Sequence, residues 1–116
     1  MSAANKYAKD KIYQVGNLVI DVKLGEVSHG EESYKPHPHV FDTLVYLIEN
    51  RHREIDIEEF KTSVWHDPRI EEFQYLRNIS LARRAILDDT NKQLIRFNAE
   101  HNAYRFFGDV FEIEFE

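Results

Sequence analysis

The chain has 116 residues, of which 42% are hydrophobic and 31% are charged, a composition typical of one folded domain and not of a disordered segment. It contains no cysteine, which excludes disulfides, thiol catalysis and cysteine-based zinc sites, and no apolar run approaches the roughly 18 residues of a membrane-spanning helix. The formal net charge is −6, yet residues 69–87 carry four arginines against two glutamates. Local charge decides what approaches a surface, so this basic segment is the first candidate for function.

Residues 11–36 show the alternation of apolar and polar side chains that is typical of strands. Leu18 and Ile20 share one face at the period of two that a strand requires. Turns are expected at Gly16, Gly25 and Gly30. The pattern predicts three or four short antiparallel strands.

Two helices are predicted next, because the apolar positions change to a spacing of three and four. In the first, over residues 38–50, Pro38 suits the first turn. The second is expected to begin after Asp56, whose side chain is a good N-cap. Trp65 is expected to pack at the junction of the second and third helices. The inward residues of the two helices are Val40, Phe41, Leu44, Leu47, Ile48, Ile57, Phe60 and Val64.

A third helix is predicted over residues 69–87, after a break imposed by Pro68. Its inward stripe consists of Tyr75, Ile79, Ala82 and Ile86. Residues 94–107 then predict a β-hairpin, with strands at 94–97 and 104–107 and a turn around residues 100–102. The chain order is therefore strands, three helices and a hairpin.

Three motifs in this order make the interpretation more specific. They are FKTSVW at residues 60–65, ISLARRAILDD at 79–89, and an isoleucine-led strand at Ile95 that is followed by YRF at 104–106. With the first helix, FDTLVYLIEN, they resemble the C-terminal effector domain of OmpR/PhoB-type response regulators. The variant in ToxR/CadC-like membrane-anchored regulators is the most similar. The resemblance covers about residues 12–107.

The resemblance implies an α+β fold, a winged helix-turn-helix with an N-terminal antiparallel sheet, three helices and a C-terminal β-hairpin wing. The expected domain spans residues 12–107. Residues 1–11 would form an N-terminal arm, and residues 108–116 an acidic C-terminal tail or linker.

The implied function is sequence-specific binding of double-stranded DNA, as the effector module of a bacterial transcription regulator in phosphorelay signalling. In that family the third helix enters the major groove and the wing touches the adjacent minor groove. The expected DNA contacts are Gln74, Arg77, Asn78, Ser80, Leu81, Arg84, Lys92, Arg96 and Arg105.

Alternatives remain open on the residues alone. The arginines of the third helix could be a solvated face, and Arg83, at the border of the apolar stripe, could make a structural ion pair. Leu81 is either a single exposed residue or part of a protein-binding patch. The alternative function is a degenerate winged helix that contacts proteins in a regulatory complex.

Further partners follow from the resemblance. We expect a homodimer or tandem binding on DNA, contact with RNA polymerase or a partner regulator, and no small-molecule substrate. The expected location is cytoplasmic, as a small stand-alone regulator or as the cytoplasmic portion of a membrane-anchored protein.

No enzymatic motif is present: the sequence has no glycine-rich phosphate loop, no GxSxG and no HExxH. His37 and His39 are two residues apart, but without cysteine, and with the other histidines scattered, they predict no metal site. We therefore expect no catalytic residue, no metal and no cofactor.

Overall fold

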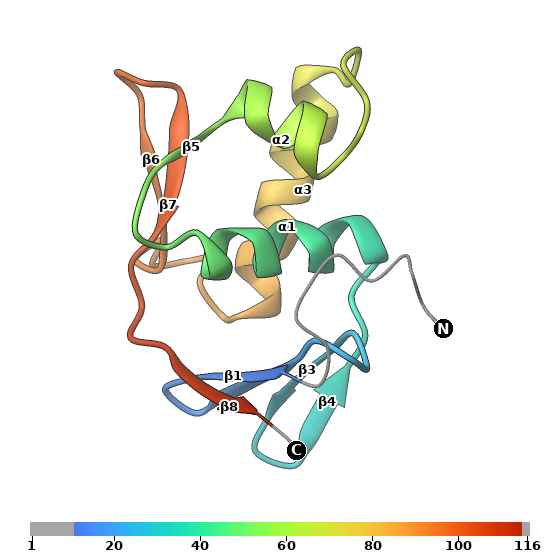
Figure 1. Ribbon diagram of the computed structural model, residues 1–116, viewed down its shortest axis with the longest axis vertical. Helices are drawn as coiled ribbons and strands as arrows, with labels where there is room; N and C mark the ends of the chain where they lie inside the picture. Colours follow the sequence, from blue (N-terminus) through green and yellow to red (C-terminus); the bar gives the residue numbers. More distant parts are fainter. Residues whose placement is uncertain (1–10, 115–116) are drawn as a thin grey trace. The chain divides into compact units, whose positions relative to one another are not determined.

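The computed structural model describes residues 11–114, and these form eight strands and three helices (Figure 1). They divide into two compact units. One comprises the N-terminal segment up to Pro36 together with the C-terminal segment from Asp109, and the other comprises His37–Gly108. Among the described residues, no helix is both long enough and apolar enough to cross a membrane.

The first unit is a five-stranded antiparallel sheet in the order β4-β3-β2-β1-β8. Its first four strands are β1 (Lys11–Val15), β2 (Leu18–Asp21), β3 (Glu26–His29) and β4 (Glu32–Tyr34). The prediction of short antiparallel strands in this region is confirmed. Each turn contains a predicted glycine with φ near +60° to +67°, a conformation that glycine adopts without steric cost.

Strand β8 (Phe111–Glu114) completes this sheet and differs from the sequence interpretation. It pairs with β1, with Ile12 opposite Ile113, and Lys11 Nζ lies 2.9 Å from Glu112 Oε1 (Figure 1). Residues 111–114 are therefore part of the sheet and not a tail or linker. The strand was missed because its backbone partner lies about a hundred residues away in sequence, where no local pattern reports it. Of the predicted N-terminal arm, only Lys11 lies within the described residues.

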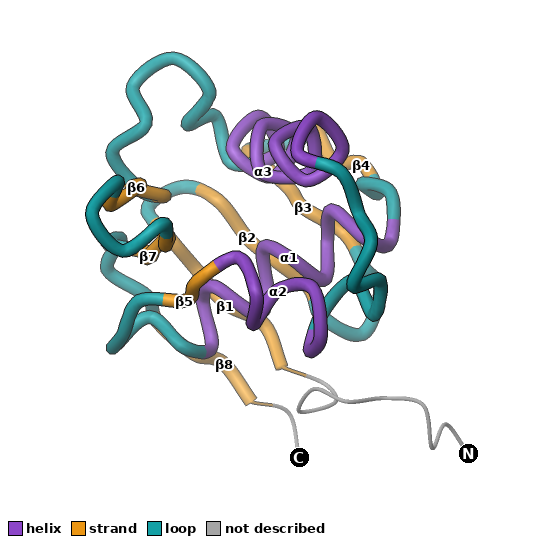
Figure 2. Tube along the Cα trace, turned by 90° about the horizontal axis from the view of Figure 1, so that it is seen from above, coloured by secondary structure: helices purple, strands orange, loops and turns teal. Residues whose placement is uncertain are grey.

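The second unit contains the three predicted helices, α1 (Pro38–Glu49), α2 (Ile57–Ser63) and α3 (Glu72–Ala85). Its small antiparallel sheet has the order β5-β7-β6, with β5 (Ile55–Asp56), β6 (Ile95–Asn98) and β7 (Ala103–Phe106). The predicted hairpin is thus confirmed as β6 and β7, which we call the wing together with the turn that joins them. Figure 2 shows β5, β6 and β7 grouped together, with α3 seen nearly end-on.

Local sequence accounts for where the helices begin. As predicted, the Asp56 carboxylate caps α2 by accepting the Glu59 N–H at 2.8 Å. The third helix starts three residues later than expected, at Glu72, because the backbone of Glu71 is extended. Gln74 Oε1 accepts the Glu71 N–H at 3.0 Å, so this side chain serves the helix start.

A stack of aromatic rings joins α2 to α3. Trp65 lies parallel to Phe60, with ring centroids 5.1 Å apart, and to Tyr75 at 6.1 Å. Its indole Nε1 donates to Thr43 Oγ1 at 2.8 Å, which ties the stack to α1. The packing role predicted for Trp65 is confirmed. Of the predicted inward stripe of α3, Ile79, Ala82 and Ile86 are buried, whereas Tyr75 is half-buried.

An ion pair joins α1, the loop after it and α2. Arg53 donates through both terminal nitrogens to the Glu59 carboxylate, at 2.9 and 2.7 Å, and the Tyr46 hydroxyl donates to the same carboxylate. The Arg53 hydrogen bonds are the main cause of a pKa of Glu59 below its usual value. Burial, followed by the Glu59 contact, raises the pKa of Tyr46.

Candidate nucleic-acid interface

The outer face of α3 is a line of four exposed side chains, Phe73, Arg77, Ser80 and Arg84. Their spacing of four, three and four places them on one side of a helix. This side is opposite to the buried stripe that contains Ile79. Phe73 was not among the predicted site residues, although its position one turn before Arg77 would have indicated it.

The charge of this face is positive and unneutralised. Residues 73–87 contain three arginines and no acidic side chain. Within the part of the chain that the structure describes, Arg77 and Arg84 make no ion pair or hydrogen bond through their side chains. Because their guanidinium groups are exposed and unpaired, they are available to an external anion.

Arg83 has a different role, since it lies between α3 and the wing. Its Nε and one terminal nitrogen donate to the Ile95 carbonyl oxygen, at 3.1 and 2.8 Å, and its guanidinium lies 5.7 Å from the centre of the Tyr104 ring. Arg83 therefore positions the wing against α3 through a backbone carbonyl and not through an ion pair.

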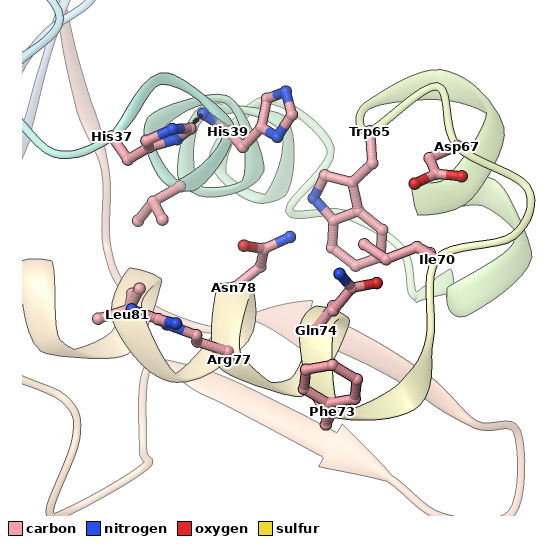
Figure 3. Close-up of a pocket in the computed structure, with 11 residues that line it drawn as sticks. His37, His39, Trp65, Asp67, Ile70, Phe73, Gln74, Arg77, Asn78 and Leu81 are labelled. Carbon is pink, nitrogen blue, oxygen red and sulfur yellow. Dashed lines mark hydrogen bonds between the residues drawn. The ribbon is translucent and has the colours of Figure 1, made fainter.

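A groove lies between α3 and the start of α1, and four predicted contacts are among its lining residues: Gln74, Arg77, Asn78 and Leu81. The groove has a volume of about 540 Å³ and is also lined by Trp65 and Ile70. Figure 3 shows Gln74 and Asn78 directed toward Trp65 and α1, whereas Phe73 points away from them. Phe73 and Arg77 of the outer face also contribute to the rim of the groove. Gln74, Asn78 and Leu81 lie beside the outer face, and Gln74 is further occupied by the helix cap.

His37 and His39 lie at the entrance of α1, on the other side of the groove. Their rings meet edge to face with centroids 5.4 Å apart, and His37 Nδ1 accepts the His39 N–H at 3.1 Å. This bond makes His37 the N-cap of α1. Among residues 11–114, no three His, Asp or Glu side chains are grouped so that they could hold a metal ion.

The predicted arginines of the wing, Arg96 and Arg105, are cross-strand neighbours. Their guanidinium carbons lie 4.3 and 5.0 Å from the centre of the Phe107 ring. The Nε of Arg96 donates to the Gln93 carbonyl at 2.7 Å, and the Nε of Arg105 donates to the Arg51 carbonyl at 3.1 Å. Because each side chain is held by a ring and a carbonyl, the wing presents its two charges in fixed positions.

Asp88 fixes the segment that leads from α3 to the wing. Its side chain is buried, and its two oxygens accept the backbone N–H groups of Gln93, Leu94 and Ile95 at 2.8, 3.0 and 2.9 Å. At the sequence level Asp88 belongs to the ISLARRAILDD motif, which does not indicate this buried role. The same segment contains the exposed Lys92, whose backbone is left-handed with φ of 52°.

Hydrogen bonds join the turn of the wing to the segment that precedes α2. Glu54 accepts a hydrogen bond from Asn98 Nδ2 at 2.7 Å, and its other oxygen lies 2.7 Å from His101 Nδ1. These bonds, with that from Asn98 the larger cause, hold the pKa of Glu54 below its usual value. A negative charge on Glu54 therefore favours the observed turn.

No protein-family model matches the chain, and no curated protein matches it by sequence. The structure is similar to the DNA-binding domain of CadC from E. coli, with a TM-score of 0.73 and 17% identity over 90% of this chain and 98% of that one. It is also similar to the response regulator DrrB of Thermotoga maritima, an OmpR/PhoB homologue, with a TM-score of 0.71 and 26% identity. That match covers 84% of this chain and 44% of DrrB.

These likenesses agree with the arrangement of the elements. Residues 64–71 join α2 to α3, and the β6–β7 hairpin is the next element after α3, the order of a helix-turn-helix with a wing. The predicted fold class is confirmed. The chain therefore has the winged-helix fold, and its structure is similar to domains of the OmpR/PhoB type.

Proposed function

We propose that this domain binds double-stranded DNA in a sequence-specific manner, as the DNA-binding module of a bacterial transcription regulator. Helix α3 would enter the major groove and the wing would contact the adjacent minor groove. The observation that carries the proposal is the outer face of α3, on which the unpaired Arg77 and Arg84 flank the exposed Ser80.

The dimensions and charges of the interface support this assignment. An α-helix with its side chains is about 10–12 Å across, and the major groove is about 12 Å wide. Arginine forms bidentate contacts with phosphates and with the guanine edge. One structural neighbour is itself a DNA-binding domain. The net charge of −6 does not oppose the proposal, because the acidic residues are absent from the segment 73–87.

The remaining predicted contacts belong to this proposal in two groups. Lys92, Arg96 and Arg105 would contact phosphates near the wing. Gln74, Asn78 and Leu81 lie beside the outer face and would meet DNA only at its margin.

A titration of labelled DNA fragments at two salt concentrations tests the proposal. Neutralising about four phosphates should make the affinity fall about a hundredfold between roughly 50 and 200 mM salt, because the release of condensed counterions is less favourable at the higher salt concentration. A pool of random duplexes, selected over several rounds, should yield an enriched sequence. Failure to bind any duplex at the lower salt concentration would exclude the proposal.

A second candidate function is contact with a regulatory protein, such as RNA polymerase or a partner regulator. The groove favours it, since apolar side chains including Leu81 and Ile70 contribute to its lining. Leu81→Asp should then abolish cross-linking to the partner. If the same variant retains DNA affinity, the two surfaces are separate.

A further inference from the structure

Phe73 is an unusual residue for an exposed helix face. It is the second residue of α3, and its side chain is 67% exposed. Within the described part of the chain, no aromatic ring or cationic group lies against its ring. Figure 3 shows the ring directed away from Trp65 and from α1.

The start of α3 does not require an aromatic residue at this position. The first turn is organised by Gln74, which accepts the Glu71 N–H, and by backbone bonds from Gln74 and Tyr75 to the Glu71 carbonyl. The helix is anchored to the core by Ile79 and Ala82, on the opposite side. Phe73 contributes to the rim of the groove but takes no part in the cap or the buried stripe, so most of its ring is available for an external apolar contact.

We propose that Phe73 reads the 5-methyl group of a thymine in the major groove, an inference that rests on the DNA binding proposed above. In a helix-turn-helix, the first residues of the recognition helix meet the base edges. Thymine is the only base that presents a methyl group there, and phenylalanine is suited to contact it. The neighbouring polar candidate, Gln74, is turned into the groove and is used by the helix cap.

The spacing along α3 places the thymine relative to the contact of Arg77. Four residues of helix rise about 6 Å, close to two base-pair steps of about 3.4 Å. Arg77 is suited to a guanine, through its O6 and N7 acceptors. The preferred sequence should therefore contain a thymine within about two base pairs of a guanine on the major-groove edge read by α3.

The test uses the complete chain and the duplex enriched by selection. Each thymine is replaced singly by deoxyuridine, which removes the methyl group and leaves the hydrogen-bonding groups unchanged. At one position, near a guanine, the unchanged protein should bind about three- to fivefold more weakly, the loss expected for one buried methyl group.

Protein variants identify the side chain responsible. Phe73→Ala, shown by circular dichroism to be folded, should bind the thymine duplex more weakly and should no longer distinguish it from the deoxyuridine duplex. The matched control is Phe111→Ala, because Phe111 has the same exposed fraction of 67% but lies on β8. That variant should keep the full difference between the two duplexes.

Three outcomes would overturn the inference. The unchanged protein binds all deoxyuridine duplexes as tightly as the parent while its binding remains selective and salt-dependent; the proposed function then stands without the thymine contact. Alternatively, Phe73→Ala lowers the affinity for the thymine duplex and the deoxyuridine duplex equally. The ring then contributes affinity but does not recognise the methyl group. Finally, absence of binding to any duplex removes both proposals.

Discussion

Asp88 shows how one buried carboxylate determines the position of the wing. Its oxygens accept three consecutive backbone N–H groups that lead into β6, and that of Ile95 would otherwise be buried without an acceptor. Because β6 carries Arg96, the buried Asp88 influences where a candidate DNA contact lies.

Asp88→Asn should lower the free energy of unfolding by about 2–4 kcal/mol, since an amide offers one acceptor oxygen and turns an N–H donor toward backbone donors. Urea denaturation followed by circular dichroism measures this. The control is Asp89→Asn, at the exposed neighbouring position, with an expected change below about 0.5 kcal/mol. Equal effects at the two positions would show that the Asp88 bonds contribute little.

The Glu59 ion pair gives stability a specific pH dependence. Arg53 holds the pKa of Glu59 below its usual value, so folding favours the charged carboxylate. The stabilisation is therefore fully present above the unfolded pKa of about 4.3 and is lost as the pH falls through the lower folded value.

Glu59→Gln should cost about 1–2 kcal/mol of unfolding free energy at pH 7, the range expected for a half-buried, hydrogen-bonded pair. The difference from the unchanged protein should begin to shrink below about pH 4.3, where Glu59 of the unfolded chain takes up a proton, and should disappear only below the lower pKa of the folded state. Denaturation curves at both pH values measure it. Glu58→Gln is the control, because the Glu58 side chain is 82% exposed. A cost for Glu59→Gln that is independent of pH would assign it to packing.

Among the elements, α3 has a buried stripe on one side and an outer face on the other. Substitutions on the outer face can therefore test DNA binding without disturbing the core. Arg77→Ala and Arg84→Ala should each weaken specific DNA binding by about 1–3 kcal/mol if the side chain reaches a base edge. If it reaches a phosphate, the loss should be uniform across sequences and the salt slope should fall by about one. Anisotropy titrations distinguish the two cases.

Lys35→Ala provides the control for this comparison, because Lys35 is an exposed cation that follows β4 in the first unit. It removes the same charge without touching α3. If both α3 variants bind like Lys35→Ala, the outer face is not the DNA contact.

The helices and the wing could be predicted because their signals are local. Pro38 and Asp56 mark helix starts by their own backbone and side-chain chemistry, and the apolar spacing around Ile79 defines the buried side of α3. By contrast, β5 has only two residues and exists because Ile55 pairs with Tyr104. Such a strand depends on a distant partner and leaves no periodic pattern.

The candidate site was only partly predictable for a similar reason. Helical spacing identifies Arg77, Ser80 and Arg84 as neighbours, but it does not reveal that Gln74 is used by the helix cap. Nor does sequence indicate that the arginines of the wing are positioned by Phe107. These features depend on side-chain contacts that form only after the elements have packed.

For the molecule as a whole, the number of contacts that one copy can make with DNA determines whether it can bind tightly alone. One recognition helix and a short wing offer few contacts against genomic competition. We therefore propose that two copies act together, as a homodimer or in tandem, and gain affinity through their effective concentration on adjacent half-sites.

The isolated chain should be largely monomeric in solution and should bind a duplex with two half-sites more tightly than one with a single half-site. Sedimentation velocity measures the first property, and footprinting on both duplexes measures the second. If one monomer binds a single half-site as tightly as the protein binds the full site, the two copies do not act together.

Strand β8 has a practical consequence for any shortened form of the protein. A chain ended at residue 107, the limit that sequence motifs suggested, would lack the partner of β1 and would leave the backbone N–H and C=O groups on that side of β1 unpaired. An open strand edge is a template for pairing with other chains. The shortened protein should therefore aggregate at concentrations where the complete chain stays dispersed, which light scattering would detect.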